Sequence, residues 1–82
     1  MEYKDGIEEI RAVFANDPVV LENLDAFLKT KESFIRDSSV DNRIAMKFAY
    51  VNIYEDLKVA WYGRKYNEDT FWRYVDALKD GL

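Results

Sequence analysis

The sequence predicts an all-α fold, an antiparallel bundle of four helices around a long central third helix. Apolar side chains recur every three or four residues along most of the chain, the spacing that places them on one face of a helix. The three glycines and the single proline fall at the ends of these apolar stretches, and no alternating run typical of a strand is present. With 82 residues, of which 49% are hydrophobic and 34% charged, residues 1–82 have the size and composition of a single domain.

The first two predicted helices are separated by a proline. The first covers about residues 6–15, where Asp5 can cap the start and the apolar stripe is Ile7, Ile10 and Phe14. The second covers residues 18–36, because Asp17 is a suitable N-cap and Pro18 fits the first helical position. Its apolar face comprises Val20, Leu24, Phe27, Leu28, Phe34 and Ile35.

The third predicted helix covers about residues 40–62 and is the longest, at roughly 35 Å for a rise of 1.5 Å per residue. Ser38 or Ser39 can cap it. It carries two apolar stripes. The first is Met46, Ala49, Tyr50, Ile53, Leu57, Ala60 and Trp61, and the second is Ile44, Phe48, Val51, Val59 and Tyr62. A helix that is apolar on two sides needs cover on both, so we expect this helix to be central.

The fourth predicted helix covers about residues 68–79. Gly63 can end the third helix, and Asn67 can cap the fourth. The spacing predicts inward-facing side chains at Phe71, Tyr74, Val75 and Leu78.

The chain contains neither cysteine nor histidine. Thiolate metal sites and cysteine nucleophiles are therefore excluded, and the commonest general base and metal ligand is missing. No calcium-binding loop, glycine-rich phosphate loop or nucleophile elbow occurs in the sequence. We therefore expect no enzymatic activity, no cofactor and no metal.

The charge is unevenly distributed along the chain. The net charge is −4; residues 1–28 contribute −5, from seven acids and two bases, and residues 29–82 contribute +1. The acidic part would attract a basic protein and repel nucleic acid, so DNA and RNA are not favoured as partners. Solvated helix faces explain the same pattern more simply. No apolar run long enough for a membrane span and no signal-peptide pattern occurs, so a cytoplasmic protein is expected.

Glu55 lies in line with apolar residues in "VNIYEDLKVAW", residues 51–61. A carboxylate buried there needs a charged or hydrogen-bonding partner. Counting residues from the turns between antiparallel helices places Glu55 and Arg11 at the same position along the bundle axis. Lys31 falls roughly 13 Å away along that axis. We therefore predict a structural residue at the edge of the core, paired with Arg11 and oriented by Asn52 one turn earlier. The alternative, a general acid or base, needs a second positioned group that the sequence does not supply.

A second candidate is the stretch "WYGRKYNEDTFWRY", residues 61–74, which combines aromatic and basic side chains. Such residues dominate protein interface hot spots, and they can also stack on bases and hold phosphates. Basic residues at a helix end also complement the helix dipole, without any ligand. We predict an exposed aromatic–basic corner that contacts another protein, formed by Trp61, Tyr62, Arg64, Lys65, Tyr66, Trp72 and Arg73.

Residues 52–75 resemble an uncharacterised domain family of bacteria and phages. In that family a long helix with an N-x-x-E core precedes a glycine turn and a helix with an acidic cap. The matching residues here are Asn52, Glu55, Gly63 and "NEDTFW". The resemblance implies that Glu55 and Gly63 are framework positions, and it implies no activity. The size and acidity of the chain are also similar to those of small phage proteins that inhibit host defence.

These observations favour a small non-enzymatic module that binds another protein, basic in character, and occupies its surface. A phage-encoded inhibitor or accessory factor, acting in the host cytoplasm, is the most concrete version. Two alternatives remain open. One is a protein that binds or sequesters a nucleotide through Trp61, Tyr62, Arg64 and Tyr66; the other is a self-assembling module, for example a homodimer joined through Tyr62, Tyr66 and Trp72.

Overall fold

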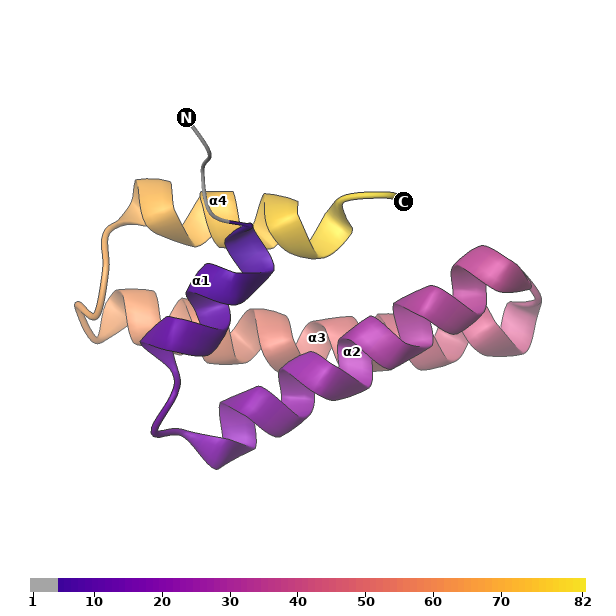
Figure 1. Ribbon diagram of the computed structural model, residues 1–82, viewed down its shortest axis with the longest axis horizontal. Coiled ribbons are helices and arrows are strands. Elements are labelled where there is room, and N and C mark those ends of the chain that lie inside the picture. Colours follow the sequence, from indigo (N-terminus) through magenta and orange to yellow (C-terminus); the bar gives the residue numbers. More distant parts are fainter. Residues whose placement is uncertain (1–4) are drawn as a thin grey trace.

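The computed structural model describes residues 5–82, and these form four α-helices without a strand (Figure 1). The helices are α1 (Gly6–Val13), α2 (Pro18–Arg36), α3 (Val40–Tyr62) and α4 (Glu68–Lys79). The all-α prediction is confirmed. The bounds of α2, α3 and α4 agree with the sequence, and only α1 ends earlier than expected, because the chain turns at residues 14–16.

Helix starts are fixed by side chains that accept hydrogen bonds from free backbone N–H groups. Asp17 accepts from the Val20 N–H, and Asn67 accepts from the Thr70 N–H. Of the two serine candidates, Ser39 is the cap of α3. Gly63 ends α3 as predicted, but the left-handed backbone position is the next residue, Arg64, with φ of 67°. The tight turn between α3 and α4 therefore depends on Arg64 in a conformation that glycine adopts more easily.

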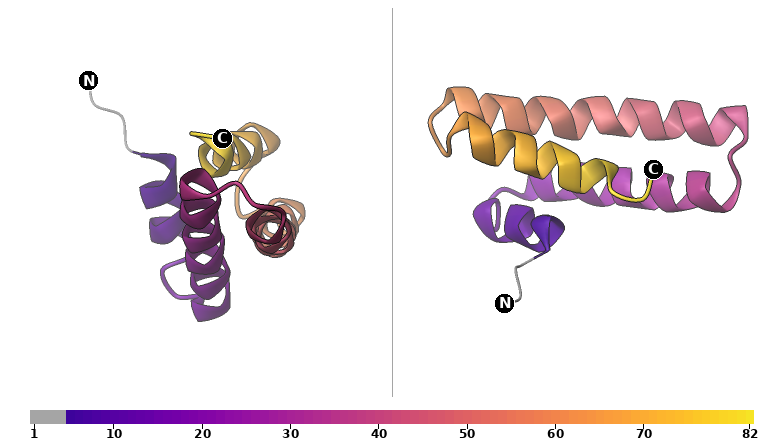
Figure 2. Two further views of the ribbon diagram at one scale, coloured as in Figure 1. Left: turned by 90° about the vertical axis from the view of Figure 1, so that its right-hand side faces the viewer. Right: turned by 90° about the horizontal axis from the view of Figure 1, so that it is seen from above.

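Each helix runs roughly opposite to the one before it (Figures 1 and 2). Helices α2 and α3 form a long hairpin, and α4 folds back along the second half of α3. The short α1 packs against α4, on the side of α2 that faces away from α3 (Figure 2, left). Helix α3 therefore contacts α2 and α4 but lies along one side of the molecule.

One hydrophobic core joins all four helices. Its largest fully buried side chains include Ile10 of α1, Phe27 of α2, Ile53 of α3 and Phe71 of α4. Among residues 5–82, the buried side chains are Ile10, Phe14, Val20, Leu24, Phe27, Ile53, Leu57, Phe71, Tyr74, Val75 and Leu78. Four of the predicted apolar faces therefore lie in the core or pack against it. They are the inward faces of α1 and α4, the first half of the α2 face and the first stripe of α3.

Helices α1 and α4 meet at a glycine. A Cβ atom placed on Gly6 would lie only 2.5 Å from the Cβ of Ala77, well inside the van der Waals distance. The absence of a side chain at Gly6 thus permits the close approach of the two helices.

The second apolar stripe of α3 contradicts the expectation that this helix is covered on two sides. Ile44, Phe48, Val51, Val59 and Tyr62 are 47–70% exposed. None of the described helices packs over them, because α2 and α4 both contact the opposite side of α3 (Figure 2, left). The prediction that these residues share one face of the helix is confirmed, but the prediction that this face is covered is wrong.

Candidate interaction surfaces

The predicted pair between Glu55 and Arg11 is wrong. Glu55 lies on the solvent face of α3 with 53% of its side chain exposed, and its Oε2 is 3.4 Å from Nζ of Lys58, one turn along the same helix. Arg11 instead reaches from α1 to α2, where its Nη2 lies 2.9 Å from Oδ1 of Asp25. Helix α1 packs on the far side of α2, so Arg11 cannot reach the outer face of α3. Asn52 is exposed on α3 as well.

The carboxylate that links two helices is the neighbouring residue, Asp56. Its Oδ2 accepts a 2.7 Å hydrogen bond from Nδ2 of Asn23 on α2, in a partly buried position. Asp56 lies about 100° further around the helix than Glu55, which turns it from the solvent face toward α2. The carboxylate that links the helices therefore lies one residue later than the sequence pattern predicts.

Replacing Asp56 by alanine is expected to lower the free energy of unfolding by about 1–3 kcal/mol, because the amide of Asn23 loses its partner in a partly buried position. Replacing Glu55 by glutamine should change it by less than about 0.5 kcal/mol, since an exposed pair contributes little. Urea denaturation of both variants measures the difference. Equal losses, or a larger loss for Glu55→Gln, would contradict these assignments.

Lys31 has a structural role that the sequence did not reveal. Its Nζ donates hydrogen bonds to the backbone carbonyl oxygens of Leu78 at 2.9 Å and Asp80 at 3.0 Å. A cation at the C-terminal end of α4 satisfies free carbonyl groups and complements the helix dipole. Lys31 thereby fastens the end of α4 to α2.

The aromatic–basic corner, formed by Trp61, Tyr62, Arg64, Lys65, Tyr66, Trp72 and Arg73, is divided between core and surface. Trp61 is half-buried, and its ring stacks on Phe71 with centroids 4.9 Å apart. Tyr66 is also half-buried, and its hydroxyl donates a 2.8 Å hydrogen bond to the Leu57 carbonyl. Burial, with a smaller effect of nearby Tyr74, raises the pKa of Tyr66 above the usual value for tyrosine, so Tyr66 remains a neutral donor. Both residues thus hold the turn between α3 and α4 against the core.

Most polar groups of the corner have partners within the chain. Arg73 pairs with Glu9 of α1 at 2.7 Å, and the indole N–H of Trp72 donates to Glu68. The ammonium of Lys65 lies over the Phe14 ring at 5.7 Å. Tyr62 and Arg64 point to solvent beside an open hollow of about 470 Å³ lined by Trp61, Arg64, Tyr66 and Asn67. The corner is therefore a mainly structural cluster with a small exposed rim.

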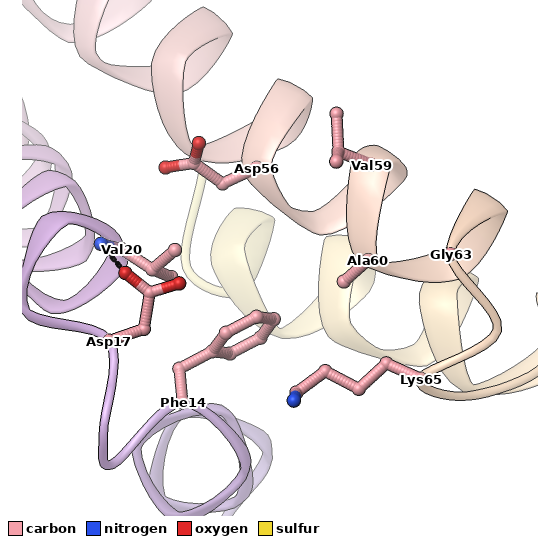
Figure 3. A pocket seen from close by; sticks show the side chains of 8 residues that line it. All are labelled: Phe14, Asp17, Val20, Asp56, Val59, Ala60, Gly63 and Lys65. Carbon is pink, nitrogen blue, oxygen red and sulfur yellow. Dashed lines mark hydrogen bonds between the residues drawn. The ribbon is translucent and has the colours of Figure 1, made fainter.

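A separate cavity of about 370 Å³ lies where the α1–α2 turn meets the C-terminal end of α3 (Figure 3). Two carboxylates, Asp17 and Asp56, and the side chain of Lys65 line it, and the Phe14 ring lies between Asp17 and Lys65. Both carboxylates already stabilise the fold, because Asp17 caps α2 and Asp56 binds Asn23. Within residues 5–82 no group of three or more acidic side chains is arranged to hold a metal ion.

The most distinctive surface is the outer stripe of α3, defined here as Val40, Ile44, Phe48, Val51, Val59 and Tyr62, with Glu55 in its middle. Phe48 is 70% exposed, although phenylalanine is one of the residues most often buried in folded proteins. The stripe extends the full length of the longest helix, roughly 33 Å. Contiguous apolar surface of this kind marks contact sites on folded proteins.

Residues 5–82 therefore form an all-α fold of four helices, with an apolar stripe on the longest of them. Comparison with family models, with curated proteins and with solved structures gave no match. The resemblance of residues 52–75 to an uncharacterised family stays a prediction. None of the helices in the part of the chain from residue 5 onward is both long and apolar enough to cross a membrane.

Proposed function

We propose that this protein is a non-enzymatic interaction module and that the outer stripe of α3 is its contact surface. The observation that carries the proposal is the exposure of the six apolar side chains of the outer stripe along α3, whereas the other described helices bury most of theirs. Leaving such a stripe in water costs roughly 25 cal/mol for each Å² of apolar surface, and a partner that covers it recovers that free energy. An inhibitor that occupies its target's surface, which the size and acidity of the chain favour, would need a face of this kind.

The aromatic–basic corner supports binding of a nucleotide less well. Trp61 and Tyr66 are packed against the core, and Arg73 is paired with Glu9. A base could not stack on the Trp61 face that covers Phe71 without unpacking the start of α4.

Photo-crosslinking tests the proposed contact surface in the cells that produce the protein. A photoreactive phenylalanine analogue at position 48 is expected to form covalent protein adducts, either with another protein or with a second copy of the chain. The same analogue at position 19 is the matched control, because Val19 is 61% exposed but lies on α2, away from the stripe. An absence of adducts from position 48, or the same adducts from both positions, would overturn the proposal.

A further inference from the structure

The outer stripe of α3 is spaced almost symmetrically about Val51. Val40 lies eleven residues before Val51, and Tyr62 lies eleven residues after it. Ile44 lies seven residues before Val51, and Val59 lies eight residues after it. A mismatch of one residue is only about 1.5 Å along a helix. A second α3 laid antiparallel across the first, with a twofold axis at Val51, therefore brings Val40 beside Tyr62, Ile44 beside Val59 and Val51 beside its own copy. Phe48, three residues before Val51, comes level with Tyr54 and Glu55 of the second copy.

Glu55 distinguishes between the two possible directions of such a pair. It lies four residues after Val51, and Lys47 lies four residues before it. In an antiparallel pair Glu55 is therefore level with Lys47 of the second copy, and it also keeps Lys58 of its own chain at 3.4 Å. In a parallel pair the two Glu55 carboxylates would face each other across the axis. Like charges at an interface are destabilising, and one polar residue in an apolar seam is known to fix orientation, so the antiparallel direction is favoured.

The exposed area approaches the size at which specific interfaces begin. An aromatic side chain can bury roughly 150–250 Å², so Phe48 and Tyr62, which are 70% and 68% exposed, supply about 200–350 Å² between them. Val40, Ile44, Val51 and Val59, each about half exposed or more, bring the stripe toward the roughly 600 Å² per partner at which specific interfaces begin. Helix α3 lies along one side of the molecule (Figure 2), and the side chains of its outer stripe are exposed, so a second copy can approach them.

We propose that the partner of the outer stripe is a second copy of this chain, in a symmetric homodimer with antiparallel α3 helices and Val51 on the twofold axis. The proposal rests on the proposed function, because the stripe must first be a contact surface. It replaces the seam expected from the sequence at Tyr62, Tyr66 and Trp72. Of those three, only Tyr62 belongs to the interface, since Tyr66 is half-buried against the chain's own core and Trp72 lies on α4.

The mass of the protein in solution tests the homodimer. Sedimentation equilibrium of the full chain at ~0.1 mM is expected to give twice the chain mass of 9.7 kDa. Phe48→Glu and Val51→Glu should each weaken association at least about 100-fold and give the monomer mass, because a carboxylate would be buried in the seam. Val19→Glu, the control on α2, should dimerise like the wild type. Circular dichroism must show unchanged helix content in all three variants, since each substituted residue is exposed.

The direction of pairing is tested by disulfide formation, which is simple because the chain contains no cysteine. In an antiparallel pair, Val51→Cys should form a dimer by oxidation, whereas Ile44→Cys alone should not. Mixing Ile44→Cys with Val59→Cys should form the crosslinked heterodimer, because these positions face each other. Efficient crosslinking of Ile44→Cys with itself would establish a parallel pair and overturn the proposed geometry.

The outcomes separate this proposal from the proposed function. A wild-type mass of 9.7 kDa at ~0.1 mM, combined with adducts between position 48 and a different protein, would overturn the homodimer and leave the contact surface intact. A monomer mass without adducts from position 48 would overturn both.

Discussion

Replacing Phe71 by alanine is expected to lower the free energy of unfolding by about 3–5 kcal/mol, which is typical of a buried phenylalanine. Phe71 is fully buried, stacks on Trp61 at 4.9 Å and contacts the Tyr54 ring at 5.5 Å. At about 0.05–0.15 kcal/mol per residue, a chain of 82 residues has roughly 4–12 kcal/mol of stability in total. The substitution therefore removes a large share of it. Urea denaturation measures the loss.

Phe48→Ala is the matched control, because it makes the same chemical change on a ring that is 70% exposed. In solution dilute enough to dissociate the proposed dimer, this variant should lose less than about 0.5 kcal/mol. A loss similar to that of Phe71→Ala would show that Phe48 belongs to the core. The outer stripe would then not be a free surface.

Replacing Gly6 by alanine is expected to destabilise the protein by about 1–3 kcal/mol, although alanine is the better helix former. The new Cβ would lie 2.5 Å from the Cβ of Ala77, so α1 and α4 would have to move apart. The loss should appear in thermal or urea unfolding. The same movement should weaken the salt bridge between Arg73 on α4 and Glu9 on α1.

The reciprocal substitution provides the control. Ala77→Gly alone should cost about 1 kcal/mol through helix propensity, and the double variant should be less destabilised than the sum of the two single ones. Additive losses would mean that the two residues do not touch. A gain in stability for Gly6→Ala would contradict the close approach directly.

Local signals in the sequence were sufficient to place the helices. Asp17, Ser39 and Asn67 each cap a helix through the side chain that the sequence pattern indicates, and Pro18 is the first residue of α2. These effects depend on neighbouring residues alone, so no knowledge of the tertiary structure was needed. The apolar faces of α1 and α4 were predicted for the same reason, because each of these helices has only one.

Burial on α3 could not be predicted in this way. Both of its stripes have helical spacing, and the sequence does not reveal whether the cover comes from the same chain or from another. Ile53 and Leu57 are fully buried, whereas Phe48 and Val51 on the second stripe are exposed. The error came from assuming that every apolar face must be covered within one chain.

Polar pairing was mispredicted because it depends on the direction in which helices pack. The level of Arg11 along the bundle is compatible with Glu55, but α1 packs on the side of α2 opposite to α3, so Arg11 meets Asp25. A shift of one residue likewise separates exposed Glu55 from Asp56, which binds Asn23. Residue spacing predicts the position of a side chain along the helix axis. Which neighbouring helix the side chain faces depends on how the helices pack.

Hydroxyl-radical footprinting of Phe48 at increasing protein concentration tests most directly whether the outer stripe of α3 is a contact surface that the chain itself leaves uncovered. We expect the Phe48 ring to be oxidised rapidly in dilute solution and to become protected as the chains associate, while Phe71 stays protected throughout. Protection of Phe48 in dilute solution would place it in the core. Rapid oxidation at every concentration would show that no second copy covers the stripe.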